Sequence, residues 1–260
     1  MKKLLSVILL LCSFDSVIHA SQPLETETAR LAKAGSLEAD GTVEYQTSSE
    51  GTETSVPFAF EYGITNKLEL LVEPVLFTAI RPKVGRKPTG TGDTEVTLTT
   101  FLKNETDFLP ALAFAGEVKV PTAKDRLIGT GKADFNGTLI ASKRFGKLDA
   151  HVNAGYTILG RPAGVALKNI FNFSVAGEFH LNKKWDVVAE VLNETSSGFN
   201  LGDAALSTNP NGSAEISGGE TVEMIGGRFG INPHLFVALG VTHDSNDAIL
   251  FRPGISYLYF

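Results

Sequence analysis

The sequence predicts an all-β fold: a twelve-stranded antiparallel transmembrane β-barrel with a short helical segment before its first strand. Three observations predict this fold class. Apolar and polar residues alternate along most of the 260-residue chain, the connections between the alternating runs are sorted by length, and the first residues have the composition of a secretory signal.

The alternation is clearest between Ala133 and Leu159, where two runs are joined by a tight turn at Phe145–Lys147. Apolar and small residues fall on one side of the second run: Leu148, Ala150, Val152, Ala154, Tyr156 and Ile158. Polar residues and one glycine fall on the other side: Asp149, His151, Asn153, Gly155 and Thr157. A period of two separates residues onto opposite faces only in a strand, so this stretch predicts a β-hairpin.

The chain begins with a basic start, Met1–Lys3, followed by an apolar stretch, Leu4–Leu11. This order is typical of a secretory signal peptide, and the apolar stretch is too short to span a bilayer. We therefore expect a signal peptide over residues 1–20, an N-terminal periplasmic segment over residues 21–39 and the barrel over residues 40–260. The only cysteine is Cys12. It would leave with the signal peptide, so the mature chain is expected to fold without a disulfide.

One stretch of the periplasmic segment, Glu25–Gly35, has helical character. Acidic residues at its start, Lys33 near its end and Gly35 as a stop all fit the electrostatics of helix ends. We expect a short helix here, lying below the barrel or tucked into its mouth.

Twelve alternating runs follow. They are expected near residues 40–47, 54–62, 67–77, 93–103, 109–120, 133–144, 148–158, 168–180, 184–194, 219–229, 234–243 and 249–260. Short connections at 63–66, 104–107, 145–147, 181–183 and 230–233 alternate with long ones at 78–92, 121–132, 159–167 and 195–218. This alternation puts the tight turns at one end of the strands and the long loops at the other. Outer-membrane barrels have that layout, together with an even number of strands.

Composition excludes two other classes of protein. The net charge of -6 is acidic and evenly spread, which argues against nucleic-acid binding. Beyond the signal peptide, no window approaches the roughly 20 apolar residues that a transmembrane helix needs.

The polar side of the runs is expected to line the lumen. The candidate residues for contact with a solute are Glu61, Glu69, Glu73, Glu95, Glu117, Lys119, Arg144, Asp149, His151, Glu178 and Glu190. The alternation alone also permits a soluble barrel with an apolar interior. The signal peptide, the sorted loops and the chain end favour the lipid-facing arrangement. Tyr62, Tyr156, Phe179 and Trp185 lie near predicted strand ends, where interfacial aromatic girdles occur.

The last residues, Arg252–Phe260, resemble the C-terminal strand by which bacterial outer-membrane proteins are recognised for insertion. The resemblance implies that the barrel-insertion machinery reads Gly254, Tyr257 and an aromatic residue at Tyr259 or Phe260. The expected partners are this machinery, the outer-membrane bilayer and a small-molecule solute.

Three central stretches carry a family resemblance: Gly90–Glu95, Pro110–Thr122 and Gly129–Phe135. Together they look like the outer-membrane family named for the MetA pathway of phenol degradation. The resemblance covers most of the mature chain and implies passage of small solutes, aromatic or apolar, across the outer membrane. It supplies no binding residues to carry over to this sequence.

The charge of the polar face is the sharpest functional clue in the residues themselves. Besides the candidates above, the same face is expected to hold the acids Asp134 and Glu223 and the bases Lys67 and Arg252. Acids outnumber bases on this face, and an acidic lumen concentrates cations and repels anions. The alternative is that the acids pair with the bases and merely pack the interior. We expect a passive pathway for cations or neutral solutes that needs no cofactor.

Two alternatives compete with a channel. His243 and Ser245 share a strand face and locally resemble outer-membrane lipid hydrolases, which add an orienting Asn or Glu on the following strand. Ile249–Phe260 contains no such residue, so no enzyme activity is expected. The other alternative is a closed structural or adhesive barrel, with the 195–218 loop as its plug or binding surface.

Two histidines raise the question of a metal site. His151 and His180 are both expected on the polar side of neighbouring runs. A metal site needs three or four ligands, so we expect none here.

Overall fold

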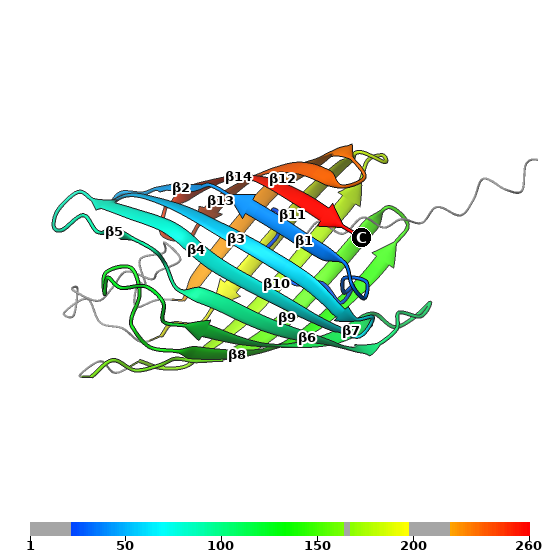
Figure 1. Ribbon diagram of the computed structural model, residues 1–260, viewed down its shortest axis with the longest axis horizontal. Helices are drawn as coiled ribbons and strands as arrows, with labels where there is room; N and C mark the ends of the chain where they lie inside the picture. The colour runs from blue at the N-terminus through cyan, green and yellow to red at the C-terminus, as the bar shows by residue number, and fades with distance from the viewer. Residues whose placement is uncertain (1–21, 164–166, 198–218) are drawn as a thin grey trace, which may run out of the picture.

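The computed structural model describes residues 22–163, 167–197 and 219–260, and every regular element in these residues is a β-strand (Figure 1). The expected signal peptide and residues 198–218 of the expected 195–218 loop lie outside the described residues. No helix in the described part of the chain has the length and apolar character to cross a membrane.

The strands follow one another along the chain with few interruptions. Their bounds are β1 (Leu37–Thr42), β2 (Glu44–Thr47), β3 (Gly51–Thr65), β4 (Leu68–Pro82), β5 (Thr89–Gly90), β6 (Thr94–Lys103), β7 (Ala111–Val120), β8 (Asp134–Phe145), β9 (Leu148–Ile158), β10 (Ile170–His180), β11 (Trp185–Glu194), β12 (Glu220–Asn232), β13 (Leu235–Asp244) and β14 (Ile249–Tyr259). Each of the twelve predicted runs coincides with a strand, and most ends agree within three residues.

The sheet closes on itself, because β1 pairs with β14 on one side and with β3 on the other. β2 continues β1 between the same two neighbours, and the two pieces form one barrel strand interrupted at Val43, whose amide donates to Pro253 O. β5 is a two-residue strand that pairs with Thr78 and Ala79 near the end of β4. The result is a closed, antiparallel barrel of twelve strands, which confirms the predicted fold class.

The hairpin of β8 and β9 is the one that the alternation predicted best. Arg144 lies opposite Asp149 and Phe145 opposite Leu148, with a two-residue turn between them. Gly146 has φ 64°, a left-handed conformation that residues with a side chain rarely adopt. The turn therefore fixes the register of both strands.

The outer face of the barrel is apolar, and its interior is polar. The large side chains exposed on the outside include Tyr62, Tyr156, Phe179 and Trp185, each between 43% and 51% exposed. The buried residues include many acids, hydroxyl residues and two arginines, whereas half of the buried apolar residues are alanines. A soluble barrel would have the opposite arrangement, so this surface fits a lipid environment.

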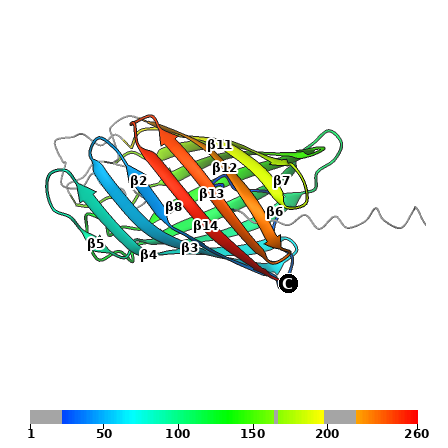
Figure 2. The same ribbon diagram turned by 90° about the horizontal axis from the view of Figure 1, so that it is seen from above.

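The connections are sorted between the two ends of the barrel (Figure 2). The end called here the short-turn end carries the connections at 66–67, 104–110, 146–147, 181–184 and 233–234. The opposite, long-loop end carries the connections at 83–93, 121–133, 159–169 and 195–219. It also carries two short hairpins, at 48–50 and 245–248, so the expected strict alternation of short and long connections is wrong at these positions.

The helix expected between Glu25 and Gly35 is wrong, because this stretch is not helical. Residues 22–36 instead run through the lumen from its middle to the short-turn end, and we call them the lumen segment. Its amides donate to the barrel wall: Glu25 N to Glu190 Oε1 at 3.0 Å and Ala29 N to Ser142 Oγ at 2.8 Å. The wall thus supplies acceptors that compete with helical hydrogen bonds.

Candidate functional site in the barrel lumen

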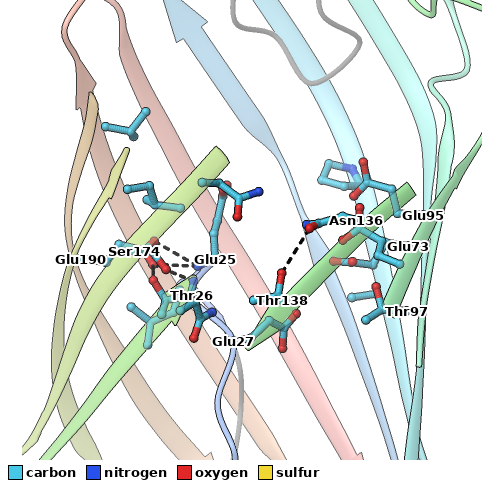
Figure 3. Close-up of a pocket in the computed structure, with 18 of the residues that line it drawn as sticks. Glu25, Thr26, Glu27, Glu73, Glu95, Thr97, Asn136, Thr138, Ser174 and Glu190 are labelled. Atoms are coloured by element: carbon cyan, nitrogen blue, oxygen red, sulfur yellow. Dashed lines mark hydrogen bonds between the residues drawn. The ribbon is translucent and has the colours of Figure 1, made fainter. Parts of the chain in front are cut away.

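A cavity of about 520 Å³ lies in the lumen between the barrel wall and the lumen segment (Figure 3). Among the described residues, three bases line it: Arg30, Lys119 and Arg252. Fifteen acids line it: Glu25, Glu27, Asp40, Glu44, Glu61, Glu69, Glu73, Glu95, Glu117, Asp134, Glu178, Glu190, Glu194, Glu220 and Asp244. The cavity is therefore strongly acidic.

The candidate residues from the sequence separate into two groups in space. Eight line the cavity: Glu61, Glu69, Glu73, Glu95, Glu117, Lys119, Glu178 and Glu190. Arg144, Asp149 and His151 face inward nearer the short-turn end, where they join a network of ion pairs and hydrogen bonds. Arg30 and Arg228, which sequence reasoning missed, complete that network.

Four adjacent strands of the barrel carry five of the fifteen acids. Strands β3, β4, β6 and β7 contribute five acids and one base, Lys119, to the cavity lining. Glu73 on β4 lies directly opposite Glu95 on β6, and both point into the cavity from the same wall (Figure 3). Lys119 forms an ion pair with Asp134. Like charges placed directly opposite each other destabilise a sheet. We call the side formed by β3, β4, β6 and β7 the acidic wall.

On the opposite side, two arginines form ion pairs with acids. Arg228 Nη2 lies 2.7 Å from Glu178 Oε2 and 3.0 Å from Asp186 Oδ2, and its side chain is 3% exposed. Arg252 Nε lies 2.8 Å from Glu44 Oε1, and its guanidinium also contacts Glu25 of the lumen segment. Arginine thus pairs with four acids outside the acidic wall: Glu25, Glu44, Glu178 and Asp186.

Arg30 fastens the lumen segment at the short-turn end. Its Nη2 lies 3.0 Å from Glu105 Oε2, in the β6–β7 connection, and 3.1 Å from Asp149 Oδ1, on β9. Asp149 also accepts from Arg144 Nε at 2.8 Å and lies 3.0 Å from His180 Nε2. One carboxylate thus joins three elements.

Glu105 is held in its charged form by the same network. Partial burial raises the pKa of its carboxyl, but the Arg144 amide, Lys143 and Arg30 together outweigh burial and hold the pKa below its ordinary value. Arg144 N donates to Glu105 Oε1 at 3.0 Å, and Lys143 Nζ lies 3.1 Å from the same atom.

The two inward histidines occupy separate sites. His151 Nδ1 is 2.8 Å from Ser142 Oγ, and its Nε2 is 3.4 Å from Glu178 Oε1. His180 lies between Asp149 and Asp186. No group of three or more metal-ligating side chains in the described part of the chain could hold a metal ion.

Glycines on the barrel wall let the lumen segment approach closely. Gly226 and Gly240 lie opposite each other on β12 and β13, and a Cβ at Gly226 would lie 2.8 Å from Pro23 Cγ. A Cβ at Gly63 would overlap the carbonyl oxygen of Lys33. Side chains at these positions would push both ends of the segment off the wall.

His243 and Ser245 do not contact each other in a catalytic arrangement. Ser245 Oγ accepts from Thr221 N at 3.1 Å, and His243, 57% exposed at its side chain, lies opposite Glu223 on the outer face. The expectation that Glu223 faces the lumen is wrong. In β12, it is Met224 and Arg228 that are buried on the inner side, and the intervening glycines hide this register from sequence reasoning.

The buried Arg228 predicts a large effect on stability. Replacing it by alanine leaves Glu178 and Asp186 without their shared cation, which typically costs about 3–5 kcal/mol. Urea unfolding of the lipid-reconstituted barrel, followed through the single Trp185, should detect the loss. Lys183→Ala, an exposed change at the same end, is the control. Equal stability of the two variants would contradict the prediction.

A family model described as "Putative MetA-pathway of phenol degradation" matches residues 20–224. No curated protein matches the sequence.

Solved structures share the fold at low sequence identity. An outer membrane channel from Pseudomonas putida F1 is 9% identical, with a TM-score of 0.71, and the alignment covers 91% of this chain and 100% of that one. The NanC porin is 10% identical, with a TM-score of 0.57, covering 84% and 98%. The KdgM porin in complex with disordered oligogalacturonate is 9% identical, with a TM-score of 0.55, covering 86% and 99%. At these identities the likeness shows the fold alone.

Proposed function

The chain belongs to the family described as the MetA pathway of phenol degradation, and on that premise we propose that it is a passive channel for small solutes in the outer membrane. One observation carries this proposal: a closed barrel with an apolar exterior encloses an acidic cavity of about 520 Å³. Cavities of this size hold small organic molecules. A lumen needs only shape and charge to select among them.

The charge of the cavity favours cations and neutral molecules. Fifteen acids and three bases line it, and a low-dielectric wall strengthens their field inside the lumen. The KdgM porin, by contrast, was solved with oligogalacturonate, an acidic saccharide. We do not extend that solute class to this chain, because its lumen would repel a polyanion.

Neutral aromatic solutes are the second class that we propose. The family description names phenol. The cavity is also lined by the apolar residues Leu71, Val75, Ile170, Leu192 and Leu250. The ring of a phenol-like solute would contact these residues, while hydroxyl and carboxylate groups of the cavity accept a hydrogen bond from the solute's hydroxyl group.

We propose a channel and not an enzyme. Two observations support this: His243 lies on the outer face, and Ser245 Oγ accepts a hydrogen bond from Thr221 N. The two side chains are therefore not arranged as a catalytic pair. The end of β14 supports recognition by the insertion machinery. Tyr257 and Tyr259 point outward there, 51% and 61% exposed, while Arg252 faces the lumen. Exchanging these tyrosines for serine would test that role through the yield of folded barrel in membranes.

Ion selectivity tests the proposed channel. In a planar bilayer under a potassium chloride gradient, the reversal potential is expected to have the sign of cation preference, because acids dominate the lumen. Uptake of phenol into reconstituted vesicles tests the neutral class, with vesicles that hold no protein as the control. Clear anion preference, or a protein that never enters the bilayer, would refute the proposal.

A further inference from the structure

The long-loop end of the barrel concentrates positive charge in three neighbouring connections. Over residues 81–93, 121–133 and 159–169 the sequence holds nine of its 23 lysines and arginines but only two acids, in a protein of net charge -6. All nine are exposed: Arg81, Lys83, Arg86, Lys87, Lys124, Arg126, Lys132, Arg161 and Lys168. We call this set the basic rim.

The two acids of these connections do not neutralise the rim. Asp93 is 3% exposed and turns inward, where its Oδ1 accepts from Ala123 N at 2.9 Å. Asp125 forms an ion pair with Arg86. The other bases therefore present their charge to the surroundings of the barrel.

Contacts between the connections hold the rim in place. The Arg86–Asp125 pair and the bond from Thr122 Oγ1 to Gly92 O, 3.1 Å long, tie the first connection to the second. Gly160 N donates to Asp134 Oδ1 at 2.7 Å, which ties the third connection to the start of β8. Because β4 to β10 are neighbours in the sheet, the bases line one continuous sector of the barrel.

The distance of the bases from the lipid-facing residues, measured along the membrane normal, indicates which layer of the membrane they face. Five of the nine follow or precede an exposed apolar residue on the lipid side by three or four positions: Phe77 and Arg81, Val120 and Lys124, Lys132 and Phe135, Ile158 and Arg161, Lys168 and Phe171. Three or four residues of extended chain span at most about 10–14 Å, so these five bases lie just beyond the lipid-facing band. For Arg81, which is in β4, a tilt of about 45° converts four residues to about 9 Å along the membrane normal. This matches the headgroup layer, which is about 5–8 Å thick on each side of the hydrocarbon.

From this charge and this height, we infer that the basic rim binds the phosphate groups of a phosphorylated glycolipid in the outer leaflet. Lysine and arginine side chains are suited to phosphate, and basic clusters at headgroup height recognise anionic lipids. The acidic lumen argues against a second role, the capture of anionic solutes for passage, because it would repel them at the next step. The inference rests on the proposed outer-membrane location.

Lipid retention tests the inference. The full chain, reconstituted in phosphatidylcholine nanodiscs with lipid A, is compared by native mass spectrometry with the same chain offered dephosphorylated lipid A. The unchanged protein is expected to retain the phosphorylated form. The variant Lys83→Gln/Lys87→Gln/Lys124→Gln/Lys132→Gln is expected to retain it at least about tenfold less, given the contribution of each lysine near an anionic surface.

A matched control separates the rim from overall charge. The variant Lys67→Gln/Lys103→Gln/Lys147→Gln/Lys183→Gln removes four exposed lysines from the short-turn end and is expected to retain lipid A like the unchanged protein. Equal retention of both lipids by the unchanged protein, or an equal loss in the control variant, would overturn the inference. Conductance of the rim variant distinguishes the two proposals, since a failed channel with normal lipid retention would count against the proposed function alone.

Discussion

Deleting residues 22–34 is expected to raise single-channel conductance several-fold. The lumen segment occupies the half of the lumen next to the short-turn end, where Arg30 bridges Glu105 and Asp149. It is bonded to the wall through acceptors such as Glu190 and Ser142, and no barrel strand is interrupted by its removal. The barrel should therefore fold with a wider lumen. Current steps in planar bilayers would measure the change, and heat-modifiable gel migration would report folding.

A single substitution tests the same segment without shortening the chain. Gly240→Leu places a side chain where Pro23 now lies and should displace the start of the segment into a more conducting arrangement. Gly116→Leu is the matched control, because a Cβ at Gly116 meets no other atom within 4 Å. If the deletion variant folds and conducts like the unchanged protein, the segment does not limit the current.

The strands could be predicted from sequence because their pattern is local. Side chains of β9 alternate between lipid and lumen along one run, and each assignment reinforces the next. The lumen segment could not be predicted in this way. Glu25 N and Ala29 N meet Glu190 and Ser142, which lie more than a hundred residues away in the sequence. The helix-end signals between Glu25 and Gly35 reflect only local interactions, and the hydrogen bonds to the barrel wall outweigh them.

The same reasoning explains which site residues were found. Glu73, Glu95 and Glu117 stand in clear alternating runs, and the structure lines the cavity with them. Arg228 was missed because Gly226 and Gly227 precede it and leave the alternation unreadable. The ion pairs of Arg30, Arg228 and Arg252 join elements that are far apart in the sequence, so they appear only in the three-dimensional structure.

The opposed pair Glu73 and Glu95 leads to the second large expected effect. Glu73→Gln/Glu95→Gln removes two opposed carboxylates from the acidic wall and is expected to lower the permeability of potassium relative to chloride several-fold. A unit charge about 4 Å from an ion in water changes its energy by about 1 kcal/mol, which is about a fivefold change in partition. Reversal potentials under a salt gradient would measure the ratio.

The control places the same charge change outside the lumen. Glu50→Gln/Glu223→Gln alters two exposed acids near the long-loop end and should leave the permeability ratio unchanged. If both double variants lose selectivity equally, net charge and not the acidic wall governs it. If neither does, the acids of the wall merely pack the interior. Stability separates these cases further, since removing opposed like charges should not weaken a barrel whose acidic wall serves transport. A wall that serves packing should lose stability in this variant, because neutral amides form weaker hydrogen bonds than the carboxylates they replace.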